Sequence, residues 1–168
     1  EELNACAHDC ANCEAECNTR VKKPAKKVIA VMSGKGGTGK SVVSVLLAKA
    51  LLRQGVKAAI LDADIVCSEI PHLLGMHDPV LGEASELVPA ASAGGIPVVS
   101  MALISENARE PIIWSGLDLA KAAVYLMTET KWDADLDVLL VDMPSGAGDI
   151  PLEYYTTMPF DCSLFVIT

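Results

Sequence analysis

The chain has 168 residues, of which 51% are hydrophobic, and this is enough apolar material for one domain with a buried core. Its formal net charge of −9 argues against a nucleic-acid groove, which needs clustered Lys and Arg. No apolar run is long enough to span a membrane, and no signal-peptide pattern opens the sequence, so we expect a cytoplasmic protein.

Residues 1–20 form a Cys-rich leader with four of the chain's six cysteines, which are Cys6, Cys10, Cys13 and Cys17. Such a cluster at one end of a chain is more typical of a metal site than of a disulfide framework. Four thiolates are the full ligand set for one 4Fe–4S cluster, and equally for a tetrahedral zinc ion. A straight helix would spread these sulfurs too far apart, so metal binding requires a loop.

Residues 21–27, "VKKPAKK", predict a basic linker, and residues 28–168 predict a single α/β domain. Short Val-, Ile- and Leu-rich runs without polar alternation are typical of strands covered on both faces. We expect strands at 28–33, 57–62, 96–103, 137–143 and 163–168, and helices at 41–54 and 116–130. This alternation predicts a doubly wound, mainly parallel sheet, whereas residues 65–95 give no clear pattern.

The last expected strand ends at Thr168, the final residue. An α/β domain seldom ends on a bare strand, so the sequence looks truncated at its C-terminus: a further portion is missing, or another chain covers that face. The two isolated cysteines, Cys67 and Cys162, are expected to be ordinary packed residues and not ligands.

Residues 34–41, "GKGGTGKS", match the phosphate-binding pattern G-x-x-x-x-G-K-[ST] between an expected strand and an expected helix. Glycines allow phosphate oxygens to approach several main-chain N–H groups, and the helix presents its positive end to the same anion. A chance match in an ordinary strand–helix turn is the alternative. The expected ATP contacts are Gly34, Lys35, Gly36, Gly37, Thr38, Gly39, Lys40, Ser41 and Val42.

Within this loop Lys40 is expected to reach the β- and γ-phosphates, and the Ser41 hydroxyl to coordinate Mg²⁺. Lys35 is either a solvated loop lysine or a residue that crosses a dimer interface to stabilise transition-state charge.

Three acids complete the expected site, because each follows or ends an expected strand, where ligands of open α/β sheets bind. Asp142 takes the Walker-B position and, with Ser41 and Asp62, is assigned to Mg²⁺ and its water shell. Asp64 is expected to orient the attacking water. The alternative is that these acids cap the helices that follow them.

Several segments together resemble the Mrp/ApbC-type ATPases, which belong to the deviant Walker-A group that includes ParA and MinD. They are "VMSGKGGTGKS", "ILDADI", "IPHLLG", "IIWSG" and "VDMPSGAGDIPL", and "CAHDCANCEAEC" resembles a leader of some members. The resemblance implies a homodimeric ATPase that carries an iron–sulfur cluster to apo-proteins, and it favours iron–sulfur over zinc at the leader.

Carried over by this resemblance, Lys35 is the signature lysine, Lys40 the loop lysine, Ser41 the Mg²⁺ ligand, Asp64 the switch acid and Asp142 the Walker-B acid. The sequence also departs from the pattern, with Cys67-Ser68-Glu69 in place of Gly-Pro-Ser and with Ser145 in place of a proline. Two alternatives therefore stay open. One is a MinD- or ParA-like positioning ATPase, and the other is a nucleotide-binding regulatory module with weak hydrolysis.

Overall fold

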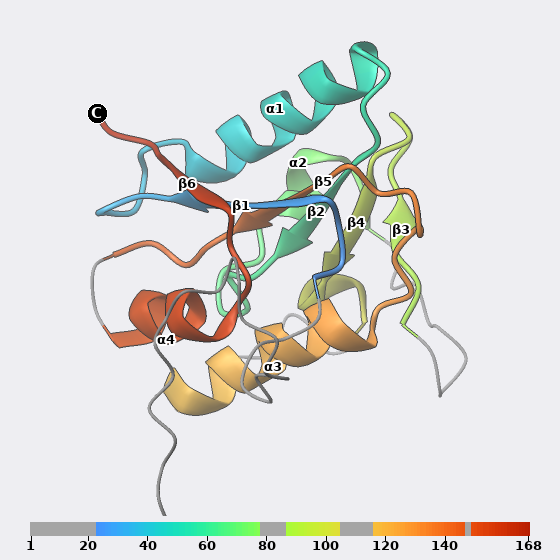
Figure 1. Cartoon of the computed structure of the whole chain (residues 1–168). Helices are drawn as coiled ribbons and strands as arrows, with labels where there is room; N and C mark the ends of the chain where they lie inside the picture. Colours follow the sequence, from blue (N-terminus) through green and yellow to red (C-terminus); the bar gives the residue numbers. More distant parts are fainter. Residues whose placement is uncertain (1–22, 78–86, 105–115, 147–148) are drawn as a thin grey trace, which may run out of the picture.

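The computed structural model describes residues 23–77, 87–104, 116–146 and 149–168 (Figure 1). The expected Cys-rich leader, with its four cysteines, lies outside the described residues. So do the first two residues of the expected linker.

A six-stranded sheet forms the centre of the described part, in the order β3-β4-β2-β5-β1-β6. All neighbours pair in parallel except β3 and β4, which are antiparallel. The expected doubly wound, mainly parallel α/β fold is thereby confirmed. The strands are β1 Lys27–Met32, β2 Ala58–Asp62, β3 Ala90–Ala91, β4 Pro97–Ser100, β5 Val138–Asp142 and β6 Cys162–Phe165.

Helices lie on both faces of this sheet (Figure 1). Helix α1 covers one face, and α3 and α4 lie side by side on the other. The short α2 follows β2, and a 3₁₀ turn, η1, follows β4. Their bounds are α1 Lys40–Arg53, α2 Ile70–Leu73, η1 Met101–Leu103, α3 Gly116–Glu129 and α4 Asp149–Thr157.

Strand β2 illustrates why apolar runs without alternation form the centre of the sheet. All five of its residues are buried, and consecutive side chains point to opposite faces. Ile60 packs in the cluster that contains Ala48 of α1, whereas Leu61 packs in the cluster that contains Leu126 of α3. Both faces of the strand therefore need apolar side chains.

The structure differs from the sequence-based expectations at several element ends. The expected strand 96–103 ends at Ser100, because residues 101–103 turn into η1, where the Ser100 hydroxyl accepts the N–H of Ala102. Strand β6 ends at Phe165 and not at Thr168. Strand β1 begins at Lys27, inside the expected linker.

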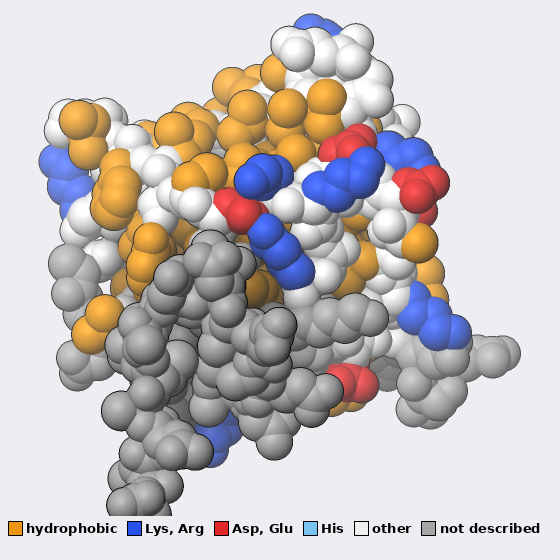
Figure 2. All heavy atoms as spheres, viewed as in Figure 1, with side chains coloured by type: hydrophobic (Ala, Val, Ile, Leu, Met, Phe, Trp, Pro, Cys, Tyr) orange, Lys and Arg blue, Asp and Glu red, His pale blue; other side chains and the backbone are white. Residues whose placement is uncertain are grey.

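Strand β6 is the least covered strand, and exposed apolar side chains lie along it and along α1 (Figure 2). Phe165 is 62% exposed and Leu46 of α1 is 58% exposed. The expectation that Cys67 and Cys162 are packed is wrong, because both are free and exposed. Among the described residues, none of the helices has the length and apolar character needed to cross a bilayer.

Candidate functional site

Four neighbouring strands bring one row of residues to the carboxyl edge of the sheet. Asp142 of β5 is in register with Val31 of β1 on one side and with Asp62 of β2 on the other. Asp62 is in turn in register with Ser100 of β4. Residues at the same level of parallel strands point to the same face, so these side chains all face α1.

The loop between β1 and α1 has the backbone of an anion-binding site. Gly37 and Gly39 have φ angles of 78° and 83°, in the left-handed region that residues with a Cβ rarely adopt. Gly39 also occupies the N-cap of α1, and no side chain caps this helix end. The first N–H groups of a 14-residue helix therefore remain available to an anion, together with the positive end of the helix dipole.

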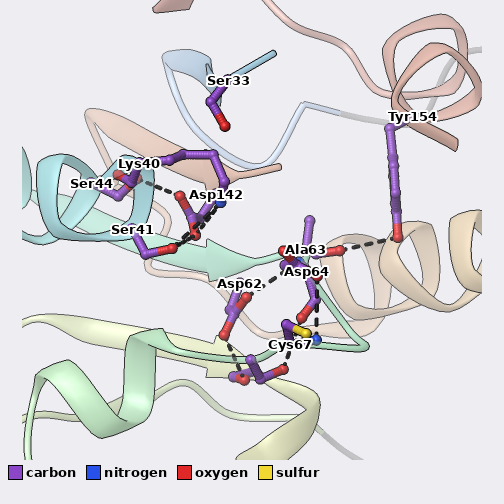
Figure 3. A network of polar contacts seen from close by, with 12 residues as sticks. Ser33, Lys40, Ser41, Ser44, Asp62, Ala63, Asp64, Cys67, Asp142 and Tyr154 are labelled. Carbon is purple, nitrogen blue, oxygen red and sulfur yellow. Dashed lines mark hydrogen bonds and ion pairs between the residues drawn. The ribbon is translucent and has the colours of Figure 1, made fainter. Parts of the chain in front are cut away.

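A buried ion pair lies directly behind this loop (Figure 3). The Lys40 ammonium donates to Asp142 Oδ2 at 2.7 Å, and the Ser41 hydroxyl donates to the same oxygen at 2.7 Å. The other oxygen, Oδ1, accepts the Ser44 hydroxyl at 2.7 Å. The Lys40 and Asp142 side chains are only 6% and 1% exposed, so the pair is shielded from water.

The two acids after β2 have different surroundings. Asp62 is fully buried; its Oδ2 accepts the Ser100 hydroxyl at 3.1 Å, and its Oδ1 accepts the main-chain N–H of Asp64 at 3.2 Å. Burial, and after it the charge of Asp142, raise the pKa of Asp62 well above its ordinary value. Burial also raises the pKa of Asp64, against the opposing charge of Lys40.

A pocket of about 250 Å³ opens in front of the loop. Its lining includes most of the residues expected to contact ATP, together with Asp64. The expected residues in the lining are Gly36, Gly37, Thr38, Gly39, Lys40, Ser41, Val42 and Asp64.

Four of the expected site residues that the structure describes do not line this pocket. Asp142 lies behind Lys40 and Ser41, and Asp62 lies beside Asp142 in the next strand. Gly34 lines a neighbouring, mainly apolar pocket, and Lys35 is exposed on the loop. The roles of Asp62 as a metal ligand and of Lys35 in catalysis stay predictions.

Sequence reasoning missed several residues that the structure brings to the site. The pocket lining also contains Ser33, Cys67, Glu69 and Ser145. Behind the lining, the buried hydroxyl of Ser44 donates to Asp142, and that of Ser100 donates to Asp62. Ser44 had one available signal, because it stands four residues after Lys40 and so shares its face of the helix. Ser100 had none, because its partner is 38 residues away.

Three features of the pocket suit it to a nucleotide's phosphates and a magnesium ion. The Thr38 Oγ1 atom is buried without a hydrogen-bond partner, so it has a bond to offer a ligand. A Cβ added to Gly37 or Gly39 would meet no atom within 4 Å, so the loop borders open space. Finally, hydroxyl and carboxylate oxygens are the donor set that Mg²⁺ prefers.

Outside this pocket, the described residues contain no cluster of side chains suited to a transition metal. They contain no group of three or more His, Cys, Asp or Glu side chains arranged to hold a metal ion. The expected ligands Cys6, Cys10, Cys13 and Cys17 fall among the residues that are not described.

Comparison with known proteins gives one family match and close sequence relatives. The family model described as "ParA: NUBPL iron-transfer P-loop NTPase" matches residues 24–168. The "Iron-sulfur cluster carrier protein" of Haemophilus influenzae is 40% identical over 166 residues, which cover 98% of this chain and 44% of that protein. The protein of the same name from Clostridium perfringens is 37% identical over 151 residues, which cover 85% and 53%. The chain thus spans about half the length of these curated relatives.

Solved structures show the same fold. A nucleotide-binding protein from Archaeoglobus fulgidus, in complex with ADP, is 34% identical, with a TM-score of 0.71 over 86% of this chain and 55% of its own. The cell division ATPase MinD of Pyrococcus furiosus is 24% identical, with a TM-score of 0.54 over 84% and 59%, and this likeness concerns the fold alone.

Proposed function

The chain belongs to the ParA-type family of NUBPL iron-transfer P-loop NTPases, and we propose that its pocket binds ATP with Mg²⁺ and hydrolyses it. The observation that carries the proposal is the buried Lys40–Asp142 pair at the uncapped start of α1. A buried ammonium beside free main-chain N–H groups is suited to a polyphosphate, which replaces the carboxylate as its counter-ion.

The proposed roles follow from the contacts around the pair. Lys40 would turn from Asp142 to the phosphates, and the Ser41 hydroxyl and the Asp142 carboxylate would hold Mg²⁺ and its water shell. Bound Mg²⁺ would neutralise charge on the phosphate oxygens. Asp64 lines the same pocket and orients the attacking water.

We also propose that the active form is a homodimer. Lys35 is exposed on the loop and does not line its own pocket. A second copy would bring its Lys35 to the phosphates, where an added cation stabilises the charge that develops during phosphoryl transfer.

The cargo that we propose is an iron–sulfur cluster delivered to apo iron–sulfur proteins. The names of the relatives support this, and so does the leader, whose four cysteines would supply the cluster's thiolates. Because the chain spans about half of those relatives, the whole cycle of loading and delivery is a proposal for the complete protein.

Single-turnover hydrolysis of ATP tests the enzymatic proposal. We expect Lys40→Ala to abolish hydrolysis and to weaken ATP binding at least about tenfold, because the phosphates lose their buried counter-ion. Lys35→Ala should keep ATP binding and lose roughly 10³-fold in rate. Lys49→Ala, a matched change at an exposed position of α1, should behave as the wild type. A wild type that binds ATP without hydrolysing it would contradict the proposed ATPase activity and favour a regulatory nucleotide-binding module.

Anaerobic reconstitution with iron and sulfide tests the cargo. The wild type should become brown and absorb in the visible, and the double change Cys10→Ser with Cys13→Ser should abolish the colour because two of four ligands are lost. As a control, changing the exposed Cys67 and Cys162 to Ser should leave the colour intact. A colourless wild-type chain that retains zinc would contradict the proposal.

A further inference from the structure

Ser44 is a buried polar residue to which the proposed mechanism gives no role. It lies on α1 and is completely buried, and its hydroxyl is 2.7 Å from Asp142 Oδ1 (Figure 3). Buried hydroxyls in helices usually bond to the carbonyl one turn earlier, and the Lys40 carbonyl is indeed 3.2 Å away. The single hydroxyl proton goes to the closer acceptor, which is also the charged one.

The two oxygens of Asp142 therefore have different partners. Oδ2 accepts Lys40 and Ser41, the two side chains that must turn to phosphate and Mg²⁺ when a nucleotide binds. Oδ1 accepts Ser44, which lies beneath them on the same helix and does not line the pocket. When Lys40 and Ser41 leave, the Ser44 bond alone of these three remains to hold the carboxylate.

We propose that Ser44 is a positioning residue for magnesium: it fixes the Asp142 carboxylate through Oδ1, so that Oδ2 faces the ion's water shell. The inference rests on the proposed binding of ATP with Mg²⁺. Partners that orient a ligand of a metal site typically change metal affinity by about 10- to 100-fold when they are removed. Ser44 touches neither phosphate nor metal, so it acts through Asp142.

The test is the Mg²⁺ dependence of ATP affinity, measured by calorimetry from EDTA to excess Mg²⁺. For Ser44→Ala we expect the Mg²⁺ concentration at half-maximal enhancement to rise about tenfold. ATP affinity in EDTA should stay within about twofold of the wild type, because the phosphate contacts of the loop are unchanged. Ser44→Cys keeps a weak hydrogen-bond donor, so its Mg²⁺ midpoint should lie between those of the wild type and Ser44→Ala. This variant replaces Ser44→Ala in the test if the alanine variant does not fold.

Ser92→Ala is the matched control, because Ser92 is also buried and its hydroxyl oxygen accepts the N–H of Ile96 at 3.0 Å, away from the site. It should lose stability without any change in Mg²⁺ dependence. Equal Mg²⁺ midpoints for Ser44→Ala and Ser92→Ala would overturn the inference, and so would an equal loss of ATP affinity in EDTA and in Mg²⁺. A wild type that binds no ATP would instead overturn the proposed function.

Discussion

Lys40 and Asp142 are 102 residues apart in the sequence and form the most buried ion pair of the described residues. The motif around Lys40 predicted its place in the pocket, and the end of an apolar strand predicted that Asp142 lies at the carboxyl edge of the sheet. Their direct contact was not predictable, because it depends on β5 pairing next to β1. Ser44 was missed for the same reason: a serine within a helix is unremarkable until its partner is known.

Asp62 gives a pH prediction at the scale of one residue. Its pKa is raised by burial and then by Asp142, so the folded chain binds this proton more tightly than the unfolded chain does. Its contribution to the free energy of unfolding is therefore favourable in acid, and is lost as the pH rises from about 4 toward the folded pKa. We expect Asp62→Asn to be more stable than the wild type at neutral pH and nearly equal to it in acid.

Urea unfolding from pH 4.5 to pH 8, in EDTA and without nucleotide, measures this difference. The two stability curves should diverge as the pH rises. Curves that run parallel over the whole range would show that Asp62 titrates normally in the folded chain.

The elements that sequence reasoning predicted best are those with a single clear pattern. Strands β1, β2 and β5 are continuous apolar runs, and α1 and α3 are long enough to show helical spacing. Helix α4 was missed because it is short and begins just after a glycine-rich turn. Contacts with other elements stabilise this helix: the buried hydroxyl of Tyr154 lies 3.1 Å from the Ala63 carbonyl (Figure 3). It also lies 3.0 Å from the Leu119 carbonyl.

Asp161 joins the start of β1 to the start of β6, and its contacts give a prediction at the scale of elements. Its Oδ2 accepts the main-chain N–H of Val28 at 2.7 Å, and its Oδ1 pairs with Lys23 at 2.6 Å and with Lys27 at 3.5 Å. Burial alone would raise the pKa of Asp161, but the Lys23 and Val28 bonds outweigh it and lower the pKa. The stabilisation is present above the unfolded pKa of about 4 and is lost as the pH falls through the folded value.

We expect Asp161→Asn to lower the free energy of unfolding by about 1 kcal/mol at pH 7, since charged bonds at a partly exposed site are screened by water. The difference from the wild type should shrink below about pH 4. Urea unfolding at pH 7 and pH 3 measures both values. Asp135→Asn, at a carboxylate that is 80% exposed, serves as the control and should change stability by less than about 0.5 kcal/mol. A full loss that persists at pH 3 would contradict the electrostatic explanation.

At the scale of the whole molecule, the alternation of strands and helices predicted the fold class, but not the order of the strands. The strand order places Val31, Asp142, Asp62 and Ser100 in one row at the carboxyl edge of the sheet. It thereby determines which acids lie next to the glycine-rich loop. The antiparallel β3 and the short α2 lay in the stretch without a clear pattern, because their residues gain structure from contacts with the rest of the sheet and not from local periodicity.

Calorimetric titration of the 168-residue chain with ATP in Mg²⁺ measures most directly whether the glycine-rich loop binds a nucleotide. We expect saturable heat for the wild type and for Lys49→Ala, and at least about tenfold weaker binding for Lys40→Ala, whose ammonium is the buried counter-ion. A wild type that releases no heat, with a crystal soaked in nucleotide whose pocket stays empty, would contradict phosphate binding by the loop.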